Sequence, residues 1–237
     1  MNKIFMENNI NNKLIIKNYS NLLDYINLTS EDITSTIINY PLEFMNIRDH
    51  YIEWELNVPI FVTTFYLFVI TYQRIPTQNE FYRCYKFINK KFFDAVKLSD
   101  ERELALKART YRAYPSLVRD LHFNKLVSEQ IKGCDTIYNS VLDIDEGIDL
   151  LISSSDGIYA INLYTKTNRA LQTRPKKRKK HNEYENVKYI EFPVEFKGSF
   201  HVGDFFLYGN KEVEELKKIM HLIRSQPSKD TTNITIA

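Results

Sequence analysis

The segment from residue 141 to residue 180 constrains the fold most, because an acidic stretch, two apolar runs and a basic run follow one another in it. Ser154-Ser155-Asp156-Gly157 has the composition of a tight hairpin turn and separates the apolar runs 147–153 and 158–164. This pattern predicts two antiparallel strands joined by the turn. The order of acids, hairpin and cations is typical of a site that holds metal and phosphate.

The elements around this hairpin predict an α+β fold. Apolar and β-branched runs predict further strands at residues 136–143, 188–196 and 205–208, and an amphipathic pattern predicts a helix at 211–224. Residues 21–98 have a helical pattern with almost no glycine. We therefore expect a helical N-terminal region over residues 1–100, a core with a central mixed β-sheet flanked by helices over 101–225, and a flexible tail over 226–237.

The helical region contains one sharp local signal. Thr77-Gln-Asn-Glu80 fits a capping box and predicts a helix start, with Phe81, Tyr85, Ile88 and Phe92 on one face. The preceding apolar run and the turn at 74–76 complete either a helix-turn-helix outline or an ordinary helical hairpin. The first alternative would place a set of cations against nucleic acid: Arg83, Lys86, Lys90 and Lys91.

Two signals mark the join to the core. The charged stretch 100–107 reads as a solvated helix face or a connection between halves. Pro115-Ser116 then predicts the start of another helix, capped by Ser116 and ended by Gly133.

Composition excludes several classes of protein. The 237 residues are 43% hydrophobic and carry 32 basic against 30 acidic side chains, so the chain is foldable and its net charge of +2 is uninformative. Cys84 and Cys134 match no metal spacing, and the N-terminus has no export signal, which favours the cytoplasm. The apolar run 58–72 is shorter than the roughly 20 residues of a membrane helix and predicts a buried helix instead.

Residues 108–208 resemble the PD-(D/E)XK nuclease superfamily, which has a restriction-endonuclease-like core. The resemblance rests on the order helix, three strands, helix, strand, with Asp149 in GIDLLI on the second strand and IYAINLYTK as the third. It implies that Asp149 and an acid on the third strand hold Mg²⁺, or Mn²⁺, beside a lysine. Asn162 stands at the position of the acid and Tyr164 at that of the lysine, with Lys166 one strand repeat further.

The resemblance also assigns roles to residues outside the hairpin. Asp120 stands where many family members carry a carboxylate on the first helix, although a surface pair with Arg119 or Lys125 explains it equally well. His122 is either a proton carrier or a packed side chain, and we favour packing. A group of acids before Asp149 marks either a cation site or a solvated turn: Asp143, Asp145 and Glu146.

The basic run is the strongest electrostatic feature. Its cations would follow a phosphate backbone without sequence preference: Arg169, Arg174, Lys176, Lys177, Arg178, Lys179 and Lys180. The string PKKRK also resembles a nuclear-localisation signal, and a solvated loop is the remaining alternative.

These observations leave three functional hypotheses. The first is a metal-dependent DNA endonuclease of a mobile element or defence system, in which Asp149, Asn162 and Asp120 hold magnesium and Lys166 stabilises charge at phosphorus. The second is a catalytically inactive protein that binds DNA, or RNA, with the same fold. The third is an interaction protein that needs a partner subunit, and a homodimer is compatible with the first two.

Overall fold

The computed structural model describes residues 20–165, 187–195, 200–225 and 234–235. These residues form two compact units that share the helix α6 (Asp100–Gln130). The helical unit comprises residues 26–123 and 200–207, and the sheet unit comprises the other described residues. Residue 100, where the sequence suggested a boundary, is the first residue of α6, and the units divide inside this helix after Phe123.

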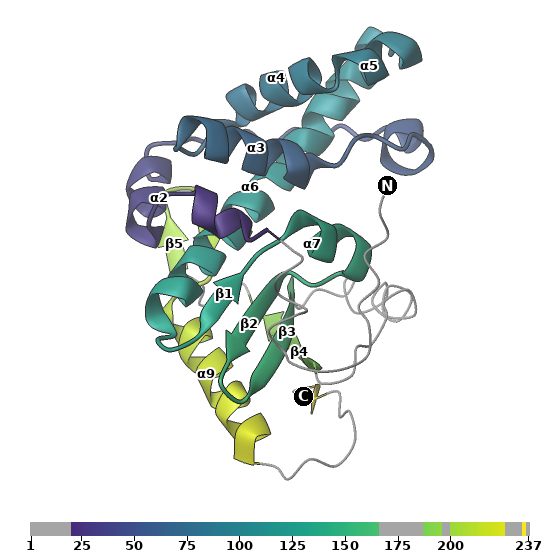
Figure 1. The fold of residues 1–237 in the computed structure, drawn as a ribbon. Coiled ribbons are helices and arrows are strands. Elements are labelled where there is room, and N and C mark those ends of the chain that lie inside the picture. The colour runs from purple at the N-terminus through teal and green to yellow at the C-terminus, as the bar shows by residue number, and fades with distance from the viewer. Residues whose placement is uncertain (1–19, 166–186, 196–199, 226–233, 236–237) are drawn as a thin grey trace. The chain divides into compact units, whose positions relative to one another are not determined.

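The sheet unit is built on a mixed β-sheet whose strands lie in the order β1-β2-β3-β4-β7 (Figure 1). β2 is antiparallel to β1 and β3, whereas β4 is parallel to β3 and β7. Together with the helices, this sheet confirms the α+β class. The elements of the unit are η1 (Leu22–Tyr25), β1 (Asp135–Ile137), α7 (Ser140–Glu146), β2 (Leu150–Ser154), β3 (Gly157–Thr165), β4 (Val187–Val194), α9 (Asn210–Ser225) and β7 (Ile234–Thr235).

The hairpin between β2 and β3 is confirmed, and polar contacts secure its turn. Ser154 pairs with Gly157, and the Asp156 carboxylate accepts a hydrogen bond from the Tyr159 hydroxyl at 2.6 Å. Arg224, near the end of α9, lies 2.6 Å from the same carboxylate. Burial raises the pKa of Asp156, but the hydrogen bonds from Ser154 and Tyr159 outweigh burial and the pKa falls to about 2.

The strand expected at residues 136–143 is wrong beyond its first part. β1 ends at Ile137, and α7 follows, because Asn139 caps the helix by accepting a hydrogen bond from the Val141 amide. Gly147 ends α7 with a φ of 65°, a conformation that glycine adopts without strain. The two caps thus override the β-branched composition of the segment.

One face of the sheet packs against α7. Leu142 of α7 belongs to a buried cluster with Leu151 of β2, Ala160 of β3 and Val187 of β4, and Tyr189 packs against it. Because side chains alternate along a strand, residues two positions from these lie on the same face. This alternation positions the polar residues described in the next subsection.

The helical unit is held by aromatic packing. Phe65, Phe81 and Phe205 all surround Tyr114, with ring centroids 5.9 to 6.4 Å from it. The elements of the unit are α2 (Ser30–Ile37), η2 (Tyr51–Glu55), α3 (Phe61–Tyr72), α4 (Gln78–Ile88), α5 (Lys90–Val96), the first part of α6, β5 (Phe200–Val202) and β6 (Phe205–Leu207). None of the helices in the described ranges has both the length and the apolar character needed to cross a membrane.

The capping box at Thr77 and Glu80 is confirmed. Phe81 and Tyr85 lie on the buried face of α4 as expected, but Ile88 is 42% exposed. Phe92 belongs to α5, because the helix is interrupted at Asn89. The expected apolar face therefore ends one turn early.

Pro115 does not start a helix, contrary to the sequence-based expectation, but lies inside the continuous helix α6. A proline has no amide hydrogen to donate to the carbonyl four residues before it, here that of Tyr111. The Gln78 side chain replaces this donor, with its Nε2 3.1 Å from the Tyr111 carbonyl oxygen in a buried position. A contact from another helix thus allows α6 to continue through Pro115.

Candidate functional site

Asp149 lies immediately before β2 and is bound to β3 on both sides of Asn162. Its backbone amide donates to the Ile161 carbonyl at 3.0 Å, and its Oδ2 accepts from the Leu163 amide at 2.6 Å. The carboxylate therefore accepts the kind of hydrogen bond that a backbone carbonyl accepts between paired strands, at the point where the pairing of β2 with β3 ends. This contact fixes the Asp149 side chain beside the middle of β3.

Asn162 faces an acid on the next strand that the sequence did not single out. Parallel pairing of β3 and β4 sets Asn162 opposite Glu191, and Asn162 Nδ2 donates to Glu191 Oε1 at 3.3 Å. Both residues lie two positions beyond members of the α7 face, Ala160 and Tyr189. Glu191 is 7% exposed, so the structure buries an acid at the edge of an apolar cluster.

The other side-chain oxygen of Asn162 has an unmet hydrogen-bonding capacity. Asn162 Oδ1 is buried and has no hydrogen-bond partner within the described part of the chain. Reversing the amide would set this oxygen against the Glu191 carboxylate, acceptor against acceptor, so Glu191 determines the orientation of the amide. A buried acceptor without a donor is costly, and a bound cation would satisfy it.

The three residues Asp149, Asn162 and Glu191, hereafter the strand triad, offer oxygen donors of the kind that Mg²⁺ and Mn²⁺ bind. The triad contains two carboxylates and one amide. Consistent with that composition, the described residues include no group of three or more His, Cys, Asp or Glu side chains placed to hold a metal ion. A metal here would depend on the Asn162 amide oxygen as a ligand.

The acids of α7 have separate environments. Asp143 Oδ2 accepts a hydrogen bond from the Tyr138 hydroxyl at 2.7 Å. Asp145 is exposed on the helix surface. Glu146 Oε2 is buried and, within the described ranges, has no hydrogen-bond partner. These residues form the helix that covers one face of the sheet, and not the solvated turn that the sequence suggested as one alternative.

The structure brings together Asp149 and Asn162 within the sheet unit. Asp120 belongs to the helical unit. Asp120 Oδ1 lies 3.6 Å from Arg119 Nε on the same helix, as the surface-pair alternative expected. His122 is 2% exposed and is therefore a packed side chain.

The cations expected at the site lie outside the described residues. These are Lys166, Arg169, Arg174, Lys176, Lys177, Arg178, Lys179 and Lys180. Tyr164, which stands where the resemblance calls for a lysine, is half-buried on β3 opposite Pro193.

Glu191 could have been found from the sequence by one signal. It is a single acid among the apolar residues of YIEF, where a buried strand ordinarily carries none. Its pairing with Asn162 could not have been predicted in this way, because the register of a parallel pair is not set by a tight turn.

The chain was compared with protein-family models, curated proteins and solved structures, and none of the three comparisons finds a match.

Proposed function

We propose that this protein processes nucleic acid as a metal-dependent DNA endonuclease, in the cytoplasm, as part of a mobile element or a defence system. The strand triad is the observation that carries the proposal, because it pairs two carboxylates with a buried amide oxygen that has no donor among the described residues. The described elements follow the order α6, β1, α7, β2, β3, β4, and the parallel pairing of β4 with β3 supports the resemblance to the PD-(D/E)XK core. The helix that the resemblance expects between the third and fourth strands falls outside the described residues.

Each residue of the triad would have a separate role at a phosphodiester. Mg²⁺ or Mn²⁺, when bound, offsets the negative charge of the phosphate and lowers the pKa of a water molecule. Asp149 and Glu191 would supply the negative charge that holds the ion, and Asn162 would contribute a neutral oxygen. Glu191 thus takes the part of the acid that Asn162 replaces, from the strand next to β3. Lys166 would stabilise charge at phosphorus.

A second candidate is a protein that binds DNA or RNA without cutting it. The observation in its favour is the pair of residues on β3 that differ from the family pattern, since Asn162 has no charge and Tyr164 cannot carry the positive charge of a lysine. In this alternative the basic run would provide the affinity for phosphates.

The experiment that tests the proposal compares cleavage by the wild type with that by Asp149→Asn and Glu191→Gln. Plasmid and single-stranded DNA are incubated with each protein in Mg²⁺, Mn²⁺ or EDTA. Both changes remove a charge and keep an acceptor oxygen for the Leu163 amide or the Asn162 amide, so the sheet is preserved. Glu214→Gln, on the exposed side of α9, is the control.

We expect metal-dependent cleavage by the wild type and the control, and a loss of about 100-fold or more in each triad variant, because even outer partners of metal ligands are worth about 10- to 100-fold. Cleavage that both triad variants retain overturns the assignment of the site. Salt-sensitive binding without cleavage by any of the proteins supports the second candidate instead.

A further inference from the structure

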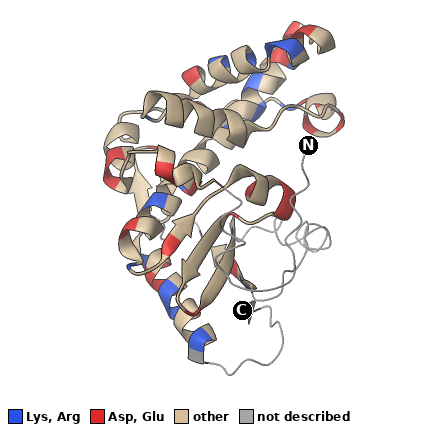
Figure 2. Ribbon diagram, in the orientation of Figure 1, with Lys and Arg blue, Asp and Glu red and all other residues tan. Residues whose placement is uncertain are grey.

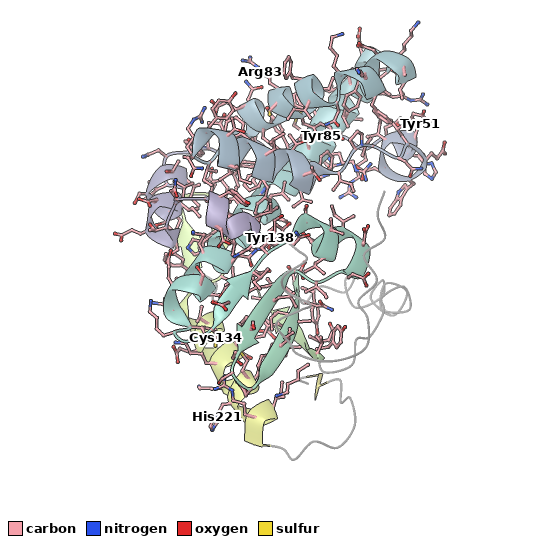
Figure 3. All side chains as sticks on the ribbon, in the orientation of Figure 1. Tyr51, Arg83, Tyr85, Cys134, Tyr138 and His221 are labelled. Atoms are coloured by element: carbon pink, nitrogen blue, oxygen red, sulfur yellow. The ribbon has the colours of Figure 1, made fainter. Side chains whose placement is uncertain are left out.

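The outer surface of α4 and α5 exposes an aromatic ring among cations. Phe87 is 80% exposed, and Arg83 precedes it by one helical turn on the same side. Lys90 and Lys91 follow across the break at Asn89 and are also exposed. Figure 3 shows Arg83 on the outer side of α4 and Tyr85 on its inner side. We call Arg83, Phe87, Lys90 and Lys91 the α4–α5 surface.

The charge of this segment is positive. Residues 78–97 carry five cations and two acids, a net charge of +3. Figure 2 colours cations and acids along α4 and α5. Glu80 is bound by Arg74, and Asp94 by Lys90 at 2.6 Å. Arg83 and Lys91 take part in no ion pair with any described residue. These two cations therefore keep their full charge for a partner.

Lys86, which the helix-turn-helix outline assigned to nucleic acid, has a structural role instead. Its ammonium is bound to Glu103 of α6 and lies 4.1 Å from the centroid of the Phe93 ring. Its side chain is 26% exposed. Lys86 therefore joins α4 to its neighbours, and we leave it out of the surface.

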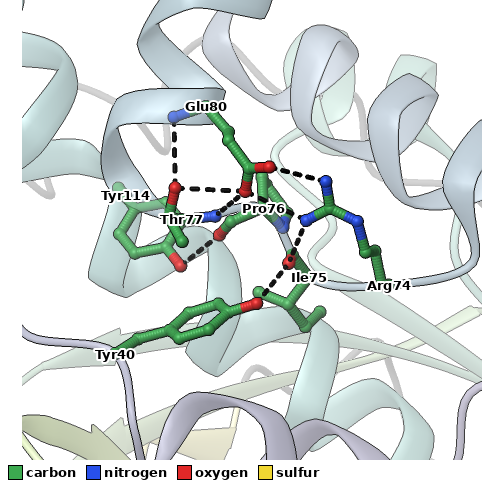
Figure 4. A network of polar contacts seen from close by, with 7 residues as sticks. All are labelled: Tyr40, Arg74, Ile75, Pro76, Thr77, Glu80 and Tyr114. Carbon is green, nitrogen blue, oxygen red and sulfur yellow. Dashed lines mark hydrogen bonds and ion pairs between the residues drawn. The ribbon is translucent and has the colours of Figure 1, made fainter.

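The N-terminal residues of α4 also make structural contacts within the helical unit. Arg74 donates to both oxygens of Glu80 at 2.9 and 2.6 Å, and the Tyr114 hydroxyl donates to the Pro76 carbonyl at 2.5 Å (Figure 4). Gln78 is 5% exposed. A helix-turn-helix protein reads bases with the N-terminal residues of its second helix. Here these residues are occupied, and the middle and the end of α4 face outward.

We propose that the α4–α5 surface binds single-stranded nucleic acid, with Phe87 stacked on an unpaired base and with Arg83 and Lys91 at the adjacent phosphates. An exposed aromatic ring can stack on the face of a base, which a duplex hides and a single strand offers. The positive charge favours a polyanionic partner over an uncharged, apolar one. The proposal rests on the proposed function for the nature of the partner, and it adds a binding surface distinct from the strand triad.

The experiment measures binding of the full-length protein to a fluorescent single-stranded oligonucleotide and to its duplex, in EDTA so that no cleavage interferes. The variants are Phe87→Ala and the double variant Arg83→Ala/Lys91→Ala. Phe44→Ala is the matched control, because Phe44 is 74% exposed and lies outside the surface. All these side chains are exposed, so circular dichroism should show unchanged folding.

We expect Phe87→Ala to weaken single-strand binding by roughly 5- to 150-fold, the fold-change of one lost base stack of about 1–3 kcal/mol, and to leave duplex binding and the control unchanged. The double variant should lower the slope of log affinity against log salt by about 1.4, at about 0.7 for each phosphate contact. Wild-type affinity in Phe87→Ala, an equal effect on the duplex, or no nucleic-acid binding at all overturns the proposal.

The two proposals fail separately. Cleavage that depends on Asp149, together with wild-type binding by Phe87→Ala, overturns the surface alone. Binding that depends on Phe87, without cleavage in any metal, overturns the nuclease alone.

Discussion

The Glu80 carboxylate, at the start of α4, accepts hydrogen bonds from the Thr77 amide at 2.8 Å and from Arg74. The Arg74 hydrogen bond lowers the pKa of Glu80 most, and together with the Thr77 contacts it outweighs burial and brings the pKa to about 2. The capping box was evident from the sequence, since it depends on residues three apart. The hydrogen bonds from Arg74 to Glu80 were not evident from the sequence, because Arg74 lies outside that pattern.

We expect Glu80→Gln to lower the free energy of unfolding at pH 7 by about 1 kcal/mol, the typical worth of a helix cap. The folded-state pKa lies below the ordinary value of 4.5, so the carboxylate stabilises the fold above pH 4.5 and loses this effect as the pH falls toward 2. The difference between the two proteins in urea unfolding should therefore shrink from pH 7 to pH 3. A difference that stays constant contradicts the account.

The control for this change is Glu214→Gln. Glu214 is 58% exposed and pairs with Lys217 one turn away on α9 at 2.7 Å. An exposed ion pair contributes little, so this variant should unfold within about 0.5 kcal/mol of the wild type at either pH.

Among the elements, α6 shows most clearly why local sequence signals are insufficient to predict every helix and strand. The hairpin, α4 and α9 were predicted because their turns, caps and apolar periods are local. The continuity of α6 through Pro115 depends on Gln78, which lies 33 residues from Tyr111 in the sequence. No local pattern could reveal that contact. The helix α7 was missed for a different reason, since its caps outweigh a composition that favours a strand.

A double-mutant cycle tests whether the Gln78 side chain replaces the amide donor that Pro115 lacks. Gln78→Ala leaves the buried Tyr111 carbonyl without a donor, and we expect a loss of about 1–3 kcal/mol in the free energy of unfolding, measured with urea. Pro115→Ala supplies an amide hydrogen to that carbonyl. In the Pro115→Ala background, Gln78→Ala should therefore cost less, by about 1 kcal/mol or more. Equal costs in the two backgrounds would show that the Gln78 contact does not replace the missing donor.

Over the whole molecule, the two units carry different parts of the proposed function. The sheet unit holds the strand triad, and the helical unit holds the α4–α5 surface. The sequence pointed to Asp149 and Asn162, because a hairpin sets its own register. It did not show that Glu191 lies opposite Asn162, because the pairing of β3 with β4 joins segments that no tight turn connects. Phe87 was missed because its exposure depends on the packing of the whole helical unit.

The most direct test of the metal site is a calorimetric titration of the wild type with Mn²⁺, repeated with Asp149→Asn and Glu191→Gln. Mn²⁺ prefers the same oxygen ligands as Mg²⁺ and binds such sites more tightly, and the readout does not depend on cleavage. We expect one site in the wild type and an affinity at least about tenfold weaker in each variant. Equal affinities in the three proteins, or no binding by the wild type, would contradict the assignment of a metal to the strand triad.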